Sequence, residues 1–340
     1  MSRALFIHGA RDVRVSPLNL REGREDEVLL DVAAVGVCGS DLHYYKDGGI
    51  GSAVIKSPFV PGHEFGGWLC DDVSELGLRR GQLVAVDPNK SCGHCEWCLE
   101  GYRNLCPNVE FIGAPPFDGA MTERLWAPKG QLVALPESFD ALDAAMLEPL
   151  GVAIHAVRLA KPQMLERVGV LGCGPIGLLI VQVLKATGAG EVLVCDPLPH
   201  RRAMAEKLGA DRASDSVASL IEWSSGGCPL VLEATNSPFG FRDAVRATRI
   251  GGRIVLVGIP DGDTYTLPAA DARRRGLKIK FARRMGEVYP LAIQFLAAGK
   301  VDVRSIVTHC VGLEEAPGVF AALAANARGY GKALIDPKRP

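Results

Sequence analysis

The chain has 340 residues, a length that predicts about two domains at roughly 150 residues each. Apolar residues make up 48% and charged residues 23%, and 38 Lys and Arg against 39 Asp and Glu leave a net charge of −1. This composition excludes disordered, collagen-like and small disulfide-stapled proteins, and the near-zero charge argues against nucleic acid or a membrane surface as a partner.

The first 150 residues predict short strands, such as 27–35 and 81–87, separated by loops rich in glycine and proline. The N-terminal apolar run is too short for a signal peptide. The longest uncharged apolar stretch, 168–184, is broken by glycines, so no membrane span is expected. We therefore expect a cytoplasmic protein whose ten cysteines are reduced thiols or metal ligands rather than disulfides.

Three separated motifs in this region carry zinc-type ligands. They are Cys38-Gly-Ser-Asp-Leu-His43, Gly62-His63-Glu64 and Glu148-Pro149. Each is ordinary when taken alone, because a single cysteine after an apolar strand usually belongs to the core. Together they offer a thiolate, an imidazole and a carboxylate, a set that balances the charge of Zn²⁺ and leaves one position open for a substrate.

A second cysteine group lies within fifteen residues and has the spacing C-x2-C-x2-C-x7-C. Its members are Cys92, Cys95, Cys98 and Cys106. Four thiolates on one loop are typical of structural zinc, which needs no open coordination position. Two alternatives are an iron–sulfur cluster, which Cys106-Pro107 resembles although the last gap is too long, and a nucleic-acid-binding finger, which lacks its usual hairpin.

The pattern changes after Pro149 to strands that alternate with helices, which predicts a parallel sheet built from βαβ units. The expected strands are 168–171, 191–195, 230–233 and 253–258, and the expected helices are 178–186, 201–208 and 241–248. A last half-exposed strand is expected over 277–281, and the remaining segment, to Pro340, returns to the first domain. The predicted boundaries are 1–150, 151–285 and 286–340.

The sequence Gly172-Cys-Gly174-Pro175-Ile176-Gly177 follows a predicted strand and opens a helix, and Asp196 ends the next strand. Such glycines let the backbone approach a pyrophosphate at the helix N-terminus, while the carboxylate accepts the ribose hydroxyls. A carboxylate repels the 2′-phosphate of NADP, so NAD is expected. Arg201 and Arg202 keep NADP as an alternative cofactor. The alternative to dinucleotide binding is an ordinary strand–helix turn followed by a chance aspartate.

In this order and spacing, the motifs resemble the zinc-dependent medium-chain alcohol dehydrogenase superfamily from Val28 to Asp336. The stretches 38–58, 111–119 and 306–309 are most similar to its polyol branch of sorbitol, xylitol and L-idonate dehydrogenases. The resemblance implies an α/β protein with a GroES-like, β-rich catalytic domain and a Rossmann domain with a doubly wound parallel sheet. It implies hydride transfer from a secondary hydroxyl of a polyol or sugar acid to NAD⁺, with one catalytic and one structural Zn²⁺ per chain. A homotetramer or homodimer is expected by analogy.

The resemblance also implies residue roles. Cys38, His63 and Glu64 match the catalytic zinc ligands, and the four-cysteine group matches the structural zinc site. Glu148 matches a second-sphere or alternative fourth ligand. Ser40 and His43 match the proton relay, and Tyr44 and Arg284 match substrate contacts. The residues expected around NAD are Gly172, Gly174, Pro175, Ile176, Gly177, Asp196, Arg201, Val257, Gly258 and Ile259.

Two departures from the family pattern concern a substrate contact and the segment before His63. Met285 follows Arg284 where sorbitol dehydrogenases carry a tyrosine, and Val60-Pro61-Gly62 replaces a more usual step before His63. The loss of a hydroxyl weakens the assignment of any particular polyol. A related enzyme acting on threonine or 2,3-butanediol is the first alternative. The second is an NAD-binding scaffold or redox sensor without turnover.

Overall fold

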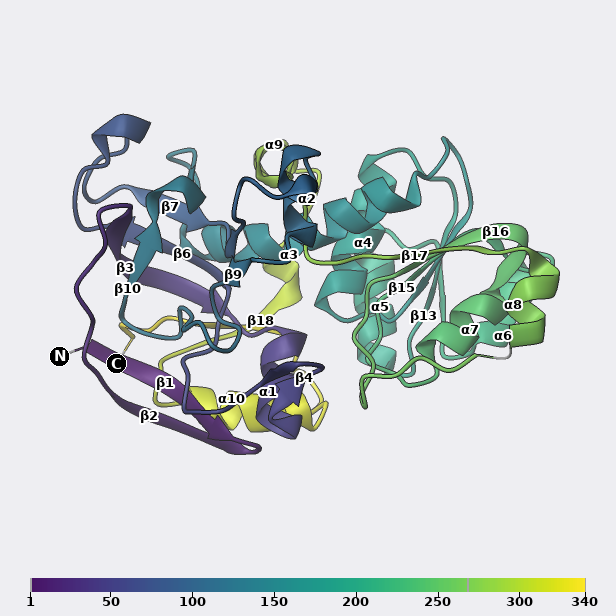
Figure 1. The fold of residues 1–340 in the computed structure, drawn as a ribbon. Coiled ribbons are helices and arrows are strands. Elements are labelled where there is room, and N and C mark those ends of the chain that lie inside the picture. Colours follow the sequence, from purple (N-terminus) through teal and green to yellow (C-terminus); the bar gives the residue numbers. More distant parts are fainter. Residues whose placement is uncertain (1, 268, 340) are drawn as a thin grey trace. The chain divides into compact units, whose positions relative to one another are not determined.

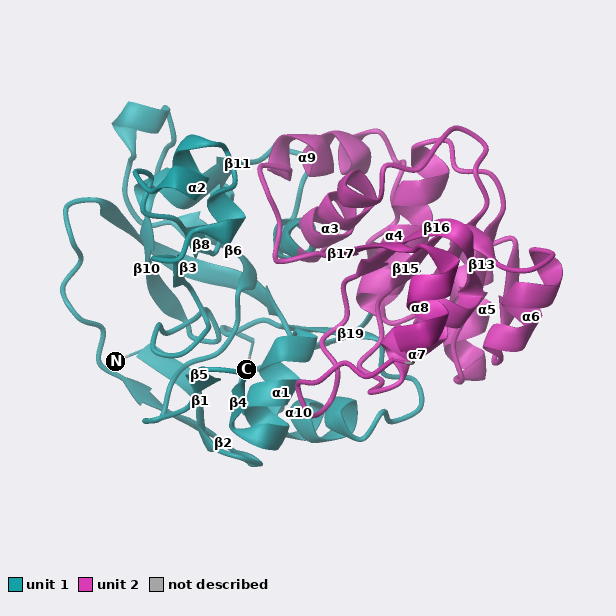
Figure 2. Ribbon diagram, turned by 45° about the vertical axis from the view of Figure 1, so that its right-hand side comes forward, with its two compact units in different colours: residues 1–148, 307–340 teal, residues 149–306 magenta. Residues whose placement is uncertain are grey.

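Two large β-sheets organise the protein, seen in a computed structural model that describes residues 2–267 and 269–339 (Figure 1). Contacts divide the chain into two units, coloured separately in Figure 2. Unit 1 comprises Met1–Glu148 and Val307–Pro340, and unit 2 comprises Pro149–Ile306. Residues 286–306 fall in unit 2, whereas the sequence analysis assigned them to the returning segment.

The sheet of unit 1 combines both ends of the chain. Its strand order is β11-β7-β6-β3-β19-β18, and β10 also pairs with β3. The bounds are β3 Glu27–Gly36, β6 Glu64–Leu69, β7 Leu83–Val86, β10 Arg124–Pro128, β11 Leu132–Ala134, β18 Val307–Val311 and β19 Lys332–Ile335. Two-stranded sheets form from β1 Ser2–Gly9 with β2 Asp12–Leu18, β4 Gly49–Ile50 with β5 Ala53–Val54, and β8 Asn89–Lys90 with β9 Glu110–Phe111. Apolar side chains such as Leu30, Phe65 and Phe320 form the core beneath them.

The helices of unit 1 are short, and two of them adjoin the metal-type motifs. They are α1 Gly39–Asp47, α2 Glu96–Leu99 and α10 Ala316–Ala324, with 3-10 turns η1 Ser74–Leu76, η2 Arg103–Leu105 and η3 Lys129–Gln131. The long helix α3, Ala141–Ala160, contains Pro149 and crosses the boundary between the units. The sequence predicts a change of pattern at this proline and no helix through it.

Unit 2 is a six-stranded parallel sheet in the order β14-β13-β12-β15-β16-β17. Its strands are β12 Val168–Leu171, β13 Val192–Cys195, β14 Arg212–Ser214, β15 Cys228–Glu233, β16 Thr248–Leu256 and β17 Lys278–Phe281. Its helices are α4 Pro175–Ala186, α5 Pro199–Lys207, α6 Val217–Trp223, α7 Gly240–Ala247, α8 Ala269–Arg275 and α9 Tyr289–Ala297, followed by η4 Arg304–Ile306. The predicted α/β fold class, with a Rossmann-type sheet, is confirmed.

The helices of unit 2 do not have the length and apolarity of membrane spans, and neither does any other helix in the described part of the chain.

Candidate functional site

Neighbouring strands bring the dispersed metal-type residues together. Strands β3 and β6 are antiparallel, with Gly36 opposite Glu64, so Cys38 just beyond β3 lies beside the start of β6. The ligand atoms of Cys38, His63 and Glu64 lie within 4.8 Å of one another. This donor set fits a four-coordinate zinc with one open position, so the three predicted ligands do converge.

Lys332 is a charged residue of this site that the sequence analysis missed. Its ammonium group, 2% exposed, pairs with the Glu64 carboxylate and donates to the carbonyl of Val37 at 3.0 Å. Burial alone would lower the pKa of Lys332, but the interaction with Glu64 opposes burial most strongly, and the pKa is raised. A lysine that opens the apolar run Ala333–Ile335 was the available signal, because buried lysines are rare unless paired.

Asp41 is the second residue that the sequence analysis left without a role. It is fully buried, and its Oδ2 accepts the backbone N–H of Cys38 at 2.9 Å, which caps helix α1. Its Oδ1 lies 3.8 Å from Nδ1 of His63, and neither of these two buried atoms has a hydrogen-bond partner among the described residues. A carboxylate behind a histidine is the usual way to orient an imidazole that binds zinc.

Helix α1 also carries both residues of the predicted proton relay. The Ser40 side chain interacts with the Cys38 thiol and opposes the rise in its pKa, which places the Ser40 hydroxyl beside the metal-type cluster. His43 is 7% exposed, and its Nδ1 lies 3.4 Å from Oδ2 of Asp47. Their part in proton transfer stays a prediction.

Glu148 lies on α3, is 5% exposed, and interacts electrostatically with His63, Glu64 and Cys38. Burial raises the pKa of its carboxyl to about 8, and the neighbouring Glu64 adds to that effect while His63 opposes it. Its oxygens are not among the ligand atoms that converge within 4.8 Å. This placement suits either of the predicted roles, a second-sphere carboxylate or an alternative ligand.

The four-cysteine loop brings its sulfur atoms close together. The Sγ–Sγ distances are 3.9 Å for Cys92–Cys98, 3.4 Å for Cys95–Cys98 and 3.8 Å for Cys95–Cys106. A tetrahedral zinc with Zn–S bonds of about 2.3 Å requires edges of about 3.8 Å. The backbone N–H of His94 lowers the pKa of Cys92 to about 6, which favours the thiolate. The four predicted ligands of a structural zinc therefore converge.

The two predicted substrate contacts lie in different units. Tyr44 is 4% exposed and packs edge-on against Phe59 with ring centroids 5.4 Å apart. Arg284 follows β17 with a φ of +54°, a strained conformation for a residue with a side chain. Met285 is buried, and a Cβ on Gly151 would lie 2.5 Å from its sulfur. The roles of Tyr44 and Arg284 stay predictions.

The glycine-rich loop follows β12 and opens helix α4. Gly172 has a φ of +88°, Gly174 caps α4, and Pro175 is in its first turn. A Cβ on Gly177 would lie 1.9 Å from the carbonyl oxygen of Gly172, so only glycine lets the helix approach the strand this closely. Ile176 also lies in the first turn of α4.

Asp196 lies at the carboxyl end of β13 and is 3% exposed. Its Oδ2 accepts the backbone N–H of Cys173 in the loop at 2.8 Å, and Nη1 of Arg201 lies 4.0 Å from the same oxygen. Val257, Gly258 and Ile259 follow β16. The predicted cofactor residues thus follow the carboxyl ends of three parallel strands, where open α/β sheets bind ligands.

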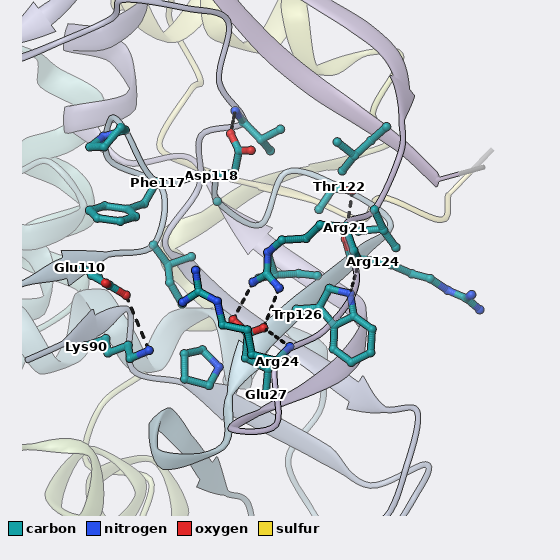
Figure 3. Close-up of a pocket in the computed structure, with 18 of the residues that line it drawn as sticks. Arg21, Arg24, Glu27, Lys90, Glu110, Phe117, Asp118, Thr122, Arg124 and Trp126 are labelled. Carbon is teal, nitrogen blue, oxygen red and sulfur yellow. Dashed lines mark hydrogen bonds and ion pairs between the residues drawn. The ribbon is translucent and has the colours of Figure 1, made fainter.

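A pocket of about 360 Å³ lies elsewhere in unit 1 (Figure 3). Two ion pairs line it, Arg21 with Glu27 at 2.6 Å and Lys90 with Glu110 at 3.6 Å. Phe117 and Trp126 form an apolar part of the lining. No residue of the predicted sites lines it. Charged side chains that line this pocket are thus largely paired with one another.

Two family models match the chain: the alcohol dehydrogenase GroES-like domain over residues 24–137 and the zinc-binding dehydrogenase over residues 175–298. Sorbitol dehydrogenase of Bacillus subtilis is 35% identical over 320 residues, which cover 92% of this chain and 91% of that protein. The structure of L-idonate 5-dehydrogenase from Escherichia coli K-12 superposes with a TM-score of 0.90 at 28% identity over 98% of both chains. That of 2R,3R-butanediol dehydrogenase from Bacillus subtilis gives 0.86 at 28%, over 99% of this chain and 100% of that one.

Two further similar structures contain dinucleotides. An alcohol dehydrogenase from Escherichia coli CFT073 in complex with NADH has a TM-score of 0.88 at 27% identity, covering 98% of this chain and 99% of that one. A zinc-binding dehydrogenase from Sinorhizobium meliloti bound to NADP has a TM-score of 0.89 at 28% identity, covering 99% of each chain.

Proposed function

The chain belongs to the medium-chain zinc-dependent alcohol dehydrogenases, and from this premise we propose that it transfers hydride from a secondary hydroxyl of a polyol or sugar acid to NAD⁺. The observation that carries the proposal is the convergence of Cys38, His63 and Glu64 with the Ser40 hydroxyl at the Cys38 sulfur. A structural metal site needs no proton acceptor beside it, whereas alcohol oxidation does.

Cys38, His63 and Glu64 would hold the catalytic zinc, and the four-cysteine loop would hold a structural one. Bound zinc supplies Lewis acidity, which makes the alkoxide of an alcohol accessible near neutral pH. Asp41 would orient the His63 ring, and Lys332 would hold the Glu64 carboxylate in place through their ion pair. Ser40 would take the hydroxyl proton, which His43 would pass towards solvent.

The cofactor would lie along the carboxyl edge of the unit 2 sheet. The glycine loop and the first turn of α4 would face the pyrophosphate, and Asp196 would accept the ribose hydroxyls. We favour NAD⁺ over NADP⁺ because the Asp196 carboxylate would repel a 2′-phosphate. Arg201, 4.0 Å from that carboxylate, is the group through which NADP⁺ would compete.

The substrate class follows from similarity to the sorbitol and L-idonate dehydrogenases. A second candidate is a smaller secondary alcohol such as 2,3-butanediol. The similarity to 2R,3R-butanediol dehydrogenase favours it, as does Met285, which offers no hydroxyl to a sugar alcohol.

The test is NADH formation at 340 nm with sorbitol, xylitol, galactitol, L-idonate, threonine, 2,3-butanediol and simple alcohols, with and without a zinc chelator. Chelator-sensitive turnover confined to polyols or sugar acids supports the proposal. Turnover confined to butanediol or threonine supports the second candidate. No turnover on any substrate by zinc-loaded protein that binds NADH would support a scaffold instead.

The relay is tested by Ser40→Ala, with Ser52→Ala as the matched control because Ser52 is exposed on a loop of the same unit. We expect kcat to fall about 10²-fold or more in Ser40→Ala, the usual effect of losing a positioned acid–base group. The zinc content should stay at two per chain. Unchanged turnover in Ser40→Ala would remove Ser40 from proton transfer.

A further inference from the structure

Glu233 is a buried carboxylate at the point where the sheet of unit 2 reverses its strand order. It ends β15, which lies next to β12, and the chain builds outward from these two strands in opposite directions. Its side chain is 1% exposed. Open α/β sheets bind their ligands at this reversal, beyond the carboxyl ends of the strands.

The carboxylate fixes the turn that follows β15. Its Oε1 accepts the backbone N–H of Thr235 at 2.8 Å and also accepts the Thr235 hydroxyl. That hydroxyl in turn accepts the backbone N–H of Ser237 at 3.1 Å. A single carboxylate oxygen therefore holds both the backbone N–H and the hydroxyl of Thr235.

Thr235 is packed between two segments expected to touch the cofactor. A Cβ on Gly172 would lie 2.7 Å from the carbonyl oxygen of Ala234 and 2.8 Å from Cγ2 of Thr235. A Cβ on Gly258 would lie 1.9 Å from the carbonyl oxygen of Thr235. Since both glycines contact this turn without clearance, a shift of Thr235 must displace the glycine loop, the segment after β16, or both.

Helix α7 also approaches this carboxylate closely, and one carboxylate oxygen has no partner. A Cβ on Gly240, the first residue of α7, would lie 2.4 Å from Oε1 of Glu233. Among the described residues, Oε2 of Glu233 is buried without a hydrogen-bond partner. Burial raises the pKa of this carboxyl, although the bonds from Thr235 oppose that rise. A buried oxygen without a partner is costly, and such local violations concentrate at functional sites.

We propose that Glu233 is a positioning residue for the dinucleotide. Its carboxylate holds Thr235 so that the Gly172 loop and the Val257–Ile259 segment keep the separation that the cofactor needs. This inference rests on the proposed binding of NAD⁺ at the carboxyl edge of the unit 2 sheet.

The test compares Glu233→Ala with Glu233→Gln, whose amide oxygen can still accept from Thr235. Leu232→Ala is the matched control, because Leu232 is fully buried on the same strand and its side chain points to the opposite face. Fluorescence titration of zinc-loaded protein should show NADH binding at least tenfold weaker in Glu233→Ala. It should stay within threefold of wild type in Glu233→Gln and within twofold in Leu232→Ala.

A second readout needs no cofactor. Hydrogen exchange of the Thr235 and Ser237 amides should accelerate in cofactor-free Glu233→Ala and stay near wild type in Glu233→Gln. If Glu233→Ala does not fold, Thr235→Val keeps the side-chain size but removes the hydroxyl, and NADH binding should weaken at least threefold.

Two outcomes would overturn the inference alone. The first is wild-type affinity for NADH in Glu233→Ala, or in Thr235→Val if Glu233→Ala does not fold. The second is a loss of NADH affinity in Leu232→Ala as large as the loss in Glu233→Ala. Absence of NADH binding by wild-type protein would overturn the proposed function as well.

Discussion

The ion pair of Lys332 and Glu64 places a buried positive charge directly behind a predicted metal ligand. Gly36 makes this possible, since a Cβ there would lie 2.1 Å from Oε2 of Glu64 and 2.9 Å from Cε of Lys332. Without the lysine, the buried Glu64 carboxylate would lose its ion-pair partner in the metal-free protein. Removing one partner of a buried pair is much more costly than removing an exposed pair.

We therefore expect Lys332→Met to destabilise the zinc-free protein by about 3–5 kcal/mol in urea unfolding. Bound zinc should reduce the loss, because it also neutralises Glu64. The control is Lys338→Met, which removes a surface pair with Asp31 of 2.9 Å and should cost about 1 kcal/mol or less. Equal losses of unfolding free energy in the two variants would show that the buried pair contributes no more to stability than the surface pair.

Cys38 should make zinc binding at the proposed catalytic site dependent on pH. Burial, aided by the nearby Glu64, raises the pKa of its thiol to about 12, so the metal-free protein carries the proton at neutral pH. Zinc binds the thiolate and must displace that proton, so its affinity rises with pH, by about tenfold per unit from this one group. Competition with a chromophoric chelator from pH 6.5 to 8.0, in protein that keeps its structural zinc, should show this slope. Cys38→Ser should flatten it, and an unchanged slope would assign the proton to another group.

At the scale of secondary structure, the metal loop of residues 92–106 has little regular structure of its own. Helix α2 has four residues and turn η2 has three, too few to be stable by their own hydrogen bonds. The four thiolates are therefore expected to order the loop through the metal that they bind.

Cys98→Ser should lower the zinc content from two to one per chain, measured by atomic absorption, and make this loop the first site of protease cleavage. Cys310→Ser, an exposed cysteine on β18, should keep both zinc ions and the wild-type cleavage pattern. A Cys98→Ser protein that retains two zinc ions would contradict the assignment of the loop.

The predicted strands and helices of unit 2 match the structure because glycines and apolar runs mark their ends. β12 is predicted over its full range, and β13, β15 and β16 deviate by a few residues. The sequence does not predict helix α3, because a proline inside a helix removes a hydrogen bond and usually ends it. Its buried run around Met146 and Leu150 packs on both sides of the proline, and this tertiary packing maintains the helix.

At the scale of the whole molecule, the chain forms unit 1 from both its ends and unit 2 from its middle. Each unit has its own apolar core, and each contains one predicted kind of ligand site. Zinc and dinucleotide should therefore stabilise different parts of the chain.

We expect hydrogen–deuterium exchange to separate the two effects. A zinc chelator should increase exchange mainly in 38–64 and 92–106, whereas NADH should decrease it mainly in 172–177, 233–240 and 257–259. A uniform change with either reagent would show that the two units respond as one.

The sequence by itself determined the metal-ligand types, the two-part α/β architecture and the glycine loop. The four-cysteine group, the glycine loop and the alternation of strands and helices follow from local spacing, whereas the roles of Cys38, His63 and Glu64 came from the family resemblance. Only the tertiary structure placed Lys332 behind Glu64 and Glu233 against Thr235. Lys332 lies 268 residues from its partner, so no local pattern relates them. Glu233 is close in sequence to Thr235, but its importance comes from Gly172 and Gly258, which only the parallel sheet brings to the same turn.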